Sequence, residues 1–373
     1  MTDLEHILPL WRELEAAGAD YVLATVVAVE GSSYRKPGAR MLLAQDGRRA
    51  GTVSGGCLEA EVAQRAWWLT SSGPVVERYS TIADDGEMPY GSGCGGVVYI
   101  LLERRRTANP LLVALEAAFH ARTPLAIATI LEGERTGHRA FAGTSAEPGD
   151  SALHELARLA LDQRKTIDTT IPLDGVPTHA FADYRPARPG LWIFGAGDDA
   201  KPLLNLAREL GWFVAVTDGR SHLATRERFA AADQVRALPI AALPADAPQH
   251  FQPHPTDAAI VMTHSFEQDS RILASLLALD FPLVYLGVLG PQRRTRELLA
   301  EAARLLHLSN IEERVEKGLE QLHAPTGLDL GAETPATVAL SILAEVQQAL
   351  TAATALPLRQ VRRYTGNLTA ATH

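Results

Sequence analysis

Two cysteines are the residues of this sequence best suited to chemistry, because both stand in glycine-rich turns. Cys57 lies in "GTVSGGCLEAEV" (residues 51–62), behind a glycine pair and before a segment with helical spacing, and Cys94 lies in "GSGCGGVVYI". A thiol at a helix N-terminus has its thiolate favoured by the helix dipole, and it can attack an electrophile, bind a soft metal or carry a persulfide. Glycines let a bulky ligand come close. The alternative is that each thiol is a small buried hydrophobic side chain.

A second candidate site is the glycine turn "IFGAGDDAKPLL", which follows an apolar strand and opens a helix. Gly195 permits the tight turn, and Gly197 lets the backbone approach a phosphate. Asp218 ends the next apolar strand, where an acid would bind the ribose of a dinucleotide. The adjacent carboxylates of Asp198 and Asp199 would compete with a pyrophosphate for the positive end of the helix. The turn predicts a Rossmann fold more firmly than it predicts a bound dinucleotide.

Two further segments are predicted to reach the same edge of a parallel sheet. "YLGVLGPQRRTRELL" ends a strand in a loop with Gly287 and Gly290, and then opens a helix with Arg293 and Arg294. Guanidinium groups beside free backbone N–H groups suit phosphate or carboxylate. His264, in "VMTHSFEQD", follows another strand on the side where open α/β sheets bind ligands. A solvated helical turn and a structural histidine are the alternatives.

The spacing of apolar residues predicts the elements that must position these side chains. Residues 1–105 predict a mixed α/β domain, and residues 106–187, with a helix starting at Leu111, predict its extension and a proline-containing linker. From 188 to 355 strands alternate with helices, which indicates a doubly wound parallel sheet of the Rossmann type. Residues 356–373 predict a loose tail. The expected fold class is therefore α/β throughout.

Composition narrows the class of protein. A chain of 373 residues with 46% hydrophobic and 21% charged residues is expected to form two domains with sizeable cores. A net charge of −9 argues against a nucleic-acid partner. We expect a cytoplasmic protein without an integral membrane segment, because no apolar run is long enough and no signal peptide pattern is present. Two cysteines in a reducing compartment form no disulfide framework and match no zinc pattern.

Several segments, in the same order, resemble the signature segments of the XdhC/CoxI family. They are "GSSYRKPGARMLLAQDGRRAGTVSGGCLE", "GCGGVVYILLE", "IFGAGDDAKPL", "VTDGR", "VMTHSFEQD", "YLGVLGPQRRT" and "HAPTGLDLGAETPATVALSILAE". Members of this family are accessory proteins for the maturation of molybdenum hydroxylases such as xanthine dehydrogenase. The resemblance implies binding of the molybdenum cofactor, as molybdopterin or its cytosine dinucleotide. It also implies a cysteine desulfurase as sulfur source and an apo-molybdenum hydroxylase as recipient.

On this resemblance, Cys57 is predicted to contact the molybdenum or a transferable sulfur, with Cys94 as the second candidate. The Rossmann loops, with Arg293 and Arg294, would hold the phosphate end or a nucleotide, and we expect a homodimer. The residues expected to supply further contacts to the cofactor are Ser54, Gly55, Gly56, Gly95 and Gly96.

Two functions from other classes remain open at this point. The first is an NAD(P)-dependent oxidoreductase built on the glycine turn and Asp218, although no catalytic pair is evident beside His264. The second is a scaffold that only docks partner enzymes and binds no small molecule.

Overall fold

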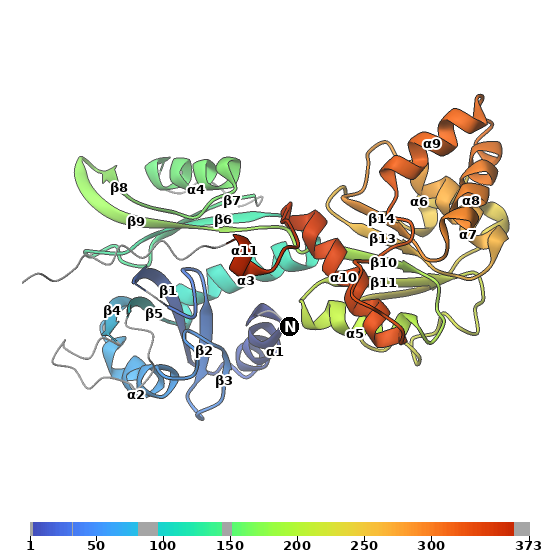
Figure 1. Cartoon of the computed structure of the whole chain (residues 1–373). Coiled ribbons are helices and arrows are strands. Elements are labelled where there is room, and N and C mark those ends of the chain that lie inside the picture. The colour runs from blue at the N-terminus through green and yellow to red at the C-terminus, as the bar shows by residue number, and fades with distance from the viewer. Residues whose placement is uncertain (1–2, 32, 81–95, 144–150, 362–373) are drawn as a thin grey trace, which may run out of the picture. The chain divides into compact units, whose positions relative to one another are not determined.

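The structure, a computed structural model, consists of two compact units, Met1–Arg188 and Pro189–His373, each with its own hydrophobic cores (Figure 1). The residues that it describes are 3–31, 33–80, 96–143 and 151–361.

The first unit begins with a five-stranded antiparallel sheet in the order β3-β2-β1-β5-β4. Its central strand β1 is buried on both faces: Tyr21 and Leu23 pack against α1 and α3, whereas Val22 and Ala24 pack against α2. Because successive side chains point to opposite faces, a strand covered on both sides reads as one continuous apolar run. The elements are α1 (Asp3–Ala16), β1 (Tyr21–Glu30), β2 (Arg40–Ala44), β3 (Arg49–Gly51), α2 (Glu59–Leu69), β4 (Val75–Ser80), β5 (Val97–Arg104) and α3 (Arg105–Ala121).

The helix predicted to start at Leu111 starts at Arg105, directly after β5, so the prediction is wrong at this end. Ala108 is fully buried, together with Leu112, in the core that α3 shares with α1 and the sheet. This packing stabilises helical backbone beyond the segment whose spacing indicated a helix, since tertiary contacts contribute more to helix stability than local propensity does.

The first unit also contains a four-stranded antiparallel sheet in the order β7-β6-β9-β8. One face of this second sheet packs against α4 through small and aliphatic residues such as Ala126, Ala128 and Leu156. The elements are β6 (Leu125–Ile130), β7 (Arg139–Ala142), α4 (Ser151–Gln163), β8 (Ile167–Leu173) and β9 (Val176–Arg185).

The second unit contains a five-stranded parallel sheet in the order β12-β11-β10-β13-β14, which confirms the predicted doubly wound Rossmann type. The order reverses between β10 and β13, and open sheets of this kind bind ligands at that point, at the C-terminal ends of the strands. The elements that alternate along the chain are β10 (Gly190–Phe194), α5 (Ala200–Glu209), β11 (Phe213–Asp218), β12 (Gln234–Ala237), β13 (Ala258–Val261), α7 (Phe266–Leu277), β14 (Tyr285–Val288) and α8 (Gln292–Leu305).

Helices cover both faces of this parallel sheet. Helices α5 and α10 pack on one face, and α7 and α8 pack on the other. Thr334 is the N-cap of α10, and its side chain forms a capping box with Thr337. The remaining elements are η1 (Ile240–Ala242), α6 (Ala247–His250), α9 (Ile311–Gln321), α10 (Pro335–Thr351) and α11 (Leu358–Val361).

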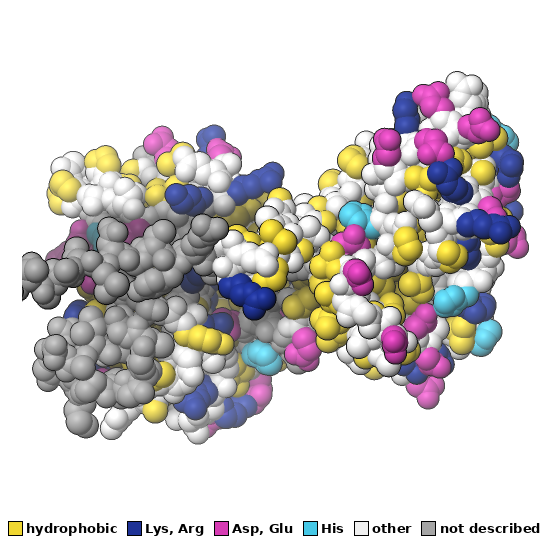
Figure 2. All heavy atoms as spheres, in the orientation of Figure 1, with side chains coloured by type: hydrophobic (Ala, Val, Ile, Leu, Met, Phe, Trp, Pro, Cys, Tyr) yellow, Lys and Arg dark blue, Asp and Glu magenta, His cyan; other side chains and the backbone are white. Residues whose placement is uncertain are grey.

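Within the described residues, no helix is long and apolar enough to cross a membrane. Figure 2 shows acidic and basic side chains interspersed on the visible face of the second unit.

Candidate functional site

Five strand ends meet at one end of the first sheet. Because neighbouring strands are antiparallel, the C-terminal ends of β1, β3 and β4 lie beside the N-terminal ends of β2 and β5. The register shows this directly: Met41 lies opposite Gly51, and Val97 lies opposite both Glu30 and Ser80. We call this end of the sheet the thiol end.

The segments that carry the predicted cysteine site leave the sheet at the thiol end. They are the Tyr34 loop (residues 31–39) after β1, the Cys57 loop (residues 52–58) after β3, and the buried Gly96 just before β5. Cys94 and Gly95 lie outside the described residues, so their predicted roles stay predictions.

Ser54 and Glu59 hold the Cys57 loop in shape. The Ser54 hydroxyl donates to Glu59 Oε2 at 2.5 Å and accepts from the backbone N–H groups of Gly56 and Leu58, both at 3.1 Å. Glu59 Oε1 accepts from the backbone N–H groups of Ser54, at 2.8 Å, and Val53, at 3.2 Å. Backbone donors on both sides of the cysteine therefore converge on one side-chain pair beneath the loop.

The carboxyl group of Glu59 is buried and charged. Only 4% of the residue is exposed. Burial alone would raise the pKa of Glu59, but the hydrogen bonds from the Ser54 side chain and from the backbone lower it below its ordinary value. The sequence analysis did not single out Glu59; its only sequence signal is an acid two residues after the cysteine, at the first position of α2.

Cys57 directly precedes Leu58, the N-cap of α2, and is half-buried, which does not favour a fully buried hydrophobic role. Gly56 has φ +111°, and among the described residues no atom lies within 4 Å of the position that a Cβ on Gly56 would take. A Cβ on Gly55 would lie 3.6 Å from the ring of Tyr34, a residue that is 75% exposed. The thiol thus lies on a loop with an exposed aromatic ring close by and, among the described residues, no atom next to the Cβ position of Gly56.

A buried ion pair ties the Tyr34 loop to the second sheet. Arg40 Nη2 donates to Asp183 Oδ2 at 2.8 Å, with both side chains 4% exposed, and Arg40 Nη1 donates to the carbonyl oxygen of Gly38 at 3.0 Å. Gly38 has φ +91°, and a Cβ there would lie 2.6 Å from both Asp183 and Arg185. Burial lowers the pKa of Arg40 to about 10, with Asp183 opposing, so the side chain stays charged at neutral pH.

The glycine turn after β10 has two different glycines. Gly195 has φ +140°, and a Cβ there would lie 2.5 Å from the carbonyl oxygen of Met262, a backbone atom that cannot move aside. At Gly197 a Cβ would instead meet Asp199 Oδ1 at 2.5 Å. The fold itself therefore requires glycine at 195, whereas the atom closest to Gly197 belongs to a carboxylate side chain.

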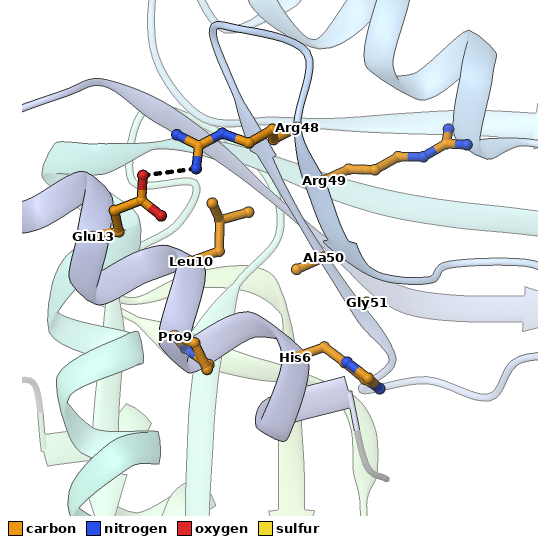
Figure 3. Close-up of a pocket in the computed structure, with 8 residues that line it drawn as sticks. All are labelled: His6, Pro9, Leu10, Glu13, Arg48, Arg49, Ala50 and Gly51. Carbon is orange, nitrogen blue, oxygen red and sulfur yellow. Dashed lines mark hydrogen bonds and ion pairs between the residues drawn. The ribbon is translucent and has the colours of Figure 1, made fainter.

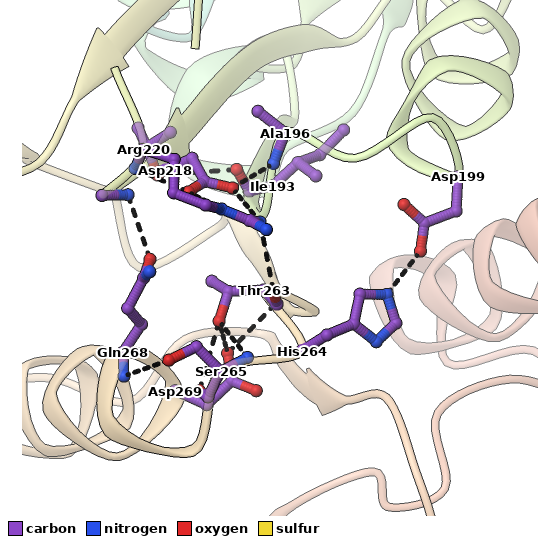
Figure 4. A network of polar contacts seen from close by, with 12 residues as sticks. Ile193, Ala196, Asp199, Asp218, Arg220, Thr263, His264, Ser265, Gln268 and Asp269 are labelled. Carbon is purple, nitrogen blue, oxygen red and sulfur yellow. Dashed lines mark hydrogen bonds and ion pairs between the residues drawn. The ribbon is translucent and has the colours of Figure 1, made fainter. Parts of the chain in front are cut away.

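Asp218, at the end of β11, holds the glycine turn (Figure 4). Its Oδ1 accepts from Arg220 N at 2.8 Å and Nε at 2.9 Å, and its Oδ2 accepts from Arg220 Nη2 at 2.7 Å and Ala196 N at 2.8 Å. A carboxylate has about four acceptor positions, and these bonds use them all. The arrangement does not favour the predicted contact with a ribose.

The electrostatics of Asp218 agree with a structural role. The residue is fully buried. Burial alone would raise its pKa, but the bonds from Arg220 and from the backbone of Ala196 lower it below its ordinary value. Arg220 also donates to the carbonyl oxygen of Thr263 at 3.2 Å and thereby bridges the ends of β11 and β13.

The segment after β13 contains a second buried aspartate. Asp269 Oδ1 accepts from the Thr263 hydroxyl at 2.6 Å and from its backbone N–H at 3.1 Å, while Asp269 Oδ2 accepts from Arg294 Nη2 at 2.6 Å. Ser265 is the N-cap of α7, and its side chain accepts a hydrogen bond from the backbone N–H of Gln268. The sequence analysis did not single out Asp269, because its partner Arg294 lies on another helix.

His264 points across the turn towards Asp199 (Figure 4). Its Nε2 lies 3.0 Å from Asp199 Oδ2, and the residue adopts a left-handed backbone conformation with φ +63°. This contact joins the β13–α7 connection to the start of α5, across the point where the strand order reverses.

The glycines and arginines of the predicted loop after β14 have different roles. A Cβ on Gly287 would lie 2.5 Å from Thr326 Oγ1, so this glycine allows the segment after α9 to pack closely against β14. Gly290 has φ +121° and follows β14. Arg293 is exposed and pairs with Glu297 on its own helix, at 3.3 Å. The predicted residues that the structure brings to the C-terminal edge of the parallel sheet are Gly195, Gly197, Asp218, His264, Gly290 and Arg294.

Among the described residues, no group of three or more His, Cys, Asp or Glu side chains could hold a metal ion. If Cys57 contacts molybdenum as predicted, the described residues would therefore supply only one ligand to the metal. Such a contact suits a metal that brings its other ligands with it.

A separate pocket of about 620 Å³ lies between α1 and β3 (Figure 3). Arg48 Nη1 and Glu13 Oε1 form an ion pair of 2.7 Å at its wall, and His6 and Gly51 line it farther along α1 and β3. The charges of this pair offset each other at the wall.

An antiparallel first unit with a thiol loop, followed by a Rossmann unit, defines the class of protein. A sequence model of the "XdhC and CoxI family" matches residues 14–80, and one of the "XdhC Rossmann domain" matches residues 191–346. A protein of Bacillus subtilis (strain 168) named as a probable xanthine dehydrogenase subunit is 33% identical over 338 residues, covering 88% of this chain and 92% of that protein. The chain belongs to the XdhC and CoxI family.

Two other relatives cover nearly the whole chain. The "Molybdenum cofactor insertion chaperone PaoD" of Escherichia coli (strain K12) is 27% identical over 354 residues, covering 92% of this chain and 88% of that protein. A crystal structure described as a xanthine dehydrogenase from Bacillus halodurans is similar with a TM-score of 0.71 and 28% identity, covering 97% of this chain and 100% of that chain.

Proposed function

We propose that this protein binds the molybdenum cofactor at the Cys57 loop and holds it as cargo for a molybdenum hydroxylase. The observation that carries the proposal is a half-exposed thiol on a glycine loop locked by Ser54 and Glu59, in a chain of the XdhC and CoxI family. The name of the relative PaoD, a molybdenum cofactor insertion chaperone, supports the same function.

The residues at the thiol end fit this cargo. Molybdenum in a dithiolene is a soft centre that accepts a thiolate, and Cys57 would supply that thiolate. The backbone at Gly56 has no described atom within 4 Å of its Cβ position, so a flat pterin would approach the loop there, with the exposed ring of Tyr34 against one face of it. Gly55 and Gly96 would add contacts from the backbone, with Ser54 shaping the loop.

Transfer partners belong to the same proposal. A cysteine desulfurase would supply the sulfur that replaces an oxo ligand of the cargo, and an apo-molybdenum hydroxylase would receive it. The desulfurase and the predicted homodimer rest on the resemblance to the XdhC/CoxI family alone.

The test compares the wild type with Cys57→Ala, both purified without oxygen from a host that makes the cofactor and is fed molybdate. Molybdenum is measured by metal analysis and the pterin by its fluorescence after oxidation. We expect the variant to lose at least about tenfold in both, because a metal–thiolate bond contributes more than the ~1.4 kcal/mol of a tenfold change. Full retention by Cys57→Ala would contradict the assignment of this thiol.

Two further samples make the result specific. Cys57→Ser keeps the size of the side chain but replaces the soft donor, so it should lose the cargo as Cys57→Ala does. Cys94→Ala tests the second candidate, and loss in that variant alone would move the site to Cys94. Absence of molybdenum and pterin from the wild type would favour the oxidoreductase, which should bind nicotinamide cofactors, or the scaffold, which should bind neither.

A further inference from the structure

We propose that Asp199 closes the glycine turn of the Rossmann domain to dinucleotides: its carboxylate, held by His264, takes the place of the diphosphate. This inference concerns the second unit and is independent of the cargo proposed for the Cys57 loop.

The position of the carboxylate is the first reason. In a dinucleotide-binding turn the second glycine is the point where the backbone approaches the pyrophosphate. Here Asp199 Oδ1 lies 2.5 Å from where a Cβ on Gly197 would stand, and so covers that approach. Asp199 is also the N-cap of α5, so its negative charge already occupies the positive end of the helix dipole.

The contact with His264 is the second reason. The imidazole Nε2 lies 3.0 Å from Asp199 Oδ2, so the carboxylate points towards the His264 ring (Figure 4). His264 makes this contact from a left-handed backbone conformation, φ +63°, which non-glycine residues adopt uncommonly. The connection after β13 thus presents the ring to the turn after β10.

The neighbouring polar groups are the third reason. All four acceptor positions of Asp218 are used by Arg220 and Ala196, so no carboxylate oxygen remains for the ribose hydroxyls. The N–H of Ala196, inside the turn, donates to Asp218 at 2.8 Å and is not available to a phosphate. A dinucleotide would therefore meet a carboxylate at the diphosphate position and no acceptor at the ribose position.

Asp198 provides a matched control. Its side chain is 81% exposed and pairs with Lys201 Nζ at 2.8 Å and Arg228 Nη2 at 3.1 Å. Both aspartates lie at the start of α5, and both carry one negative charge. Removal of either changes the net charge of the helix end equally, but only the removal of Asp199 uncovers the turn.

The experiment measures binding of ADP by calorimetry and of NADH by its fluorescence, on full-length wild type, Asp199→Ala, Asp199→Asn and Asp198→Ala. We expect both ligands to bind Asp199→Ala at least about tenfold more tightly than wild type, because a like charge a few ångströms from a diphosphate is removed. Asp199→Asn should gain less, since its amide still covers Gly197, and Asp198→Ala should gain clearly less than Asp199→Ala, because the exposed Asp198 carboxylate is screened by solvent and by Lys201 and Arg228.

Two outcomes of this experiment would overturn the proposal. Equal affinity of the wild type and Asp199→Ala overturns the proposal, and so does an equal gain in Asp198→Ala, which would indicate a general charge effect. Asp199 accepts no backbone N–H as a helix cap, so its replacement leaves α5 intact, and an unchanged circular dichroism spectrum checks this. His264→Ala should give a smaller gain than Asp199→Ala, because it releases the carboxylate without removing it.

Discussion

The ionisation of Glu59 links the shape of the Cys57 loop to pH. Its folded-state pKa lies below the ordinary value of 4.5, because the hydrogen bonds from Ser54 and the backbone outweigh burial. A carboxyl group whose pKa is lower in the folded than in the unfolded protein stabilises the fold above the unfolded pKa. That contribution is lost as the pH falls through the folded pKa. The loop should therefore keep its shape at neutral pH and lose stability in acid.

Glu59→Gln tests this link. An amide at this position directs N–H groups at the Ser54 hydroxyl, which already accepts from Gly56 and Leu58. We expect a loss of about 1–3 kcal/mol in the free energy of unfolding near neutral pH, the usual effect of a spoiled buried hydrogen bond. The difference from wild type should shrink as the pH falls below about 4.5 and through the lower folded pKa of Glu59, where the wild-type carboxyl group also becomes neutral. Urea titrations followed by circular dichroism at two pH values measure both quantities.

Glu61→Gln is the control for this prediction. Glu61 lies in the same first turn of α2, but it pairs with Arg65 at 3.2 Å on a partly exposed face. Such a pair contributes about 0–1 kcal/mol, so its loss should be small. An effect as large as that of Glu59→Gln, or a Glu59→Gln difference that stays constant in acid, would contradict the role given to Glu59.

At the scale of elements, the sequence predicts the structural features that depend on residues close together along the chain. The alternation of strands and helices predicts the Rossmann sheet, and the glycine turn after β10 lies where its spacing indicates. Arg40 and Asp183, which tie the Tyr34 loop to the second sheet, are separated by 143 positions and have no local pattern. The same holds for Asp269 and Arg294, which lie on different helices. The spacing of residues along the sequence therefore cannot predict side chains that position a site through long-range contacts.

The Arg40–Asp183 pair supplies the prediction at this scale. Asp183→Ala leaves the guanidinium of Arg40 buried without its carboxylate partner, which should cost about 3–5 kcal/mol in the free energy of unfolding. Asp168→Ala removes an exposed carboxylate from the neighbouring strand β8, where it pairs with His179, and should cost at most about 1 kcal/mol. Chemical denaturation of the two variants gives the comparison.

A double variant distinguishes the unpaired charge from a general packing defect. Arg40→Met in the Asp183→Ala background removes the buried charge and should restore part of the lost stability, because apolar replacements of buried pairs are often tolerated. If the double variant is less stable than Asp183→Ala alone, the cost of the single variant does not come from the unpaired guanidinium.

At the scale of the whole molecule, each unit has its own buried core. In the first unit, Leu23 lies at the centre of a core shared by β1, α1 and α3; in the second, Ile260 lies on β13 between β10 and β14. Both residues are fully buried. Because chains with separate cores do not unfold in one all-or-none step, we expect two transitions in calorimetry.

The cofactor should act on only one of these transitions. Leu23→Ala and Ile260→Ala should each cost about 2–5 kcal/mol and lower the melting temperature of one transition, which identifies the unit to which it belongs. Loading with the molybdenum cofactor should then raise the transition that Leu23→Ala lowers, since a ligand at about 100 times its Kd adds about 2.7 kcal/mol to the state that binds it. Calorimetry of loaded and unloaded protein measures this. A cofactor that raises the transition marked by Ile260→Ala would place the cargo in the Rossmann unit, and Cys57 would not be its ligand.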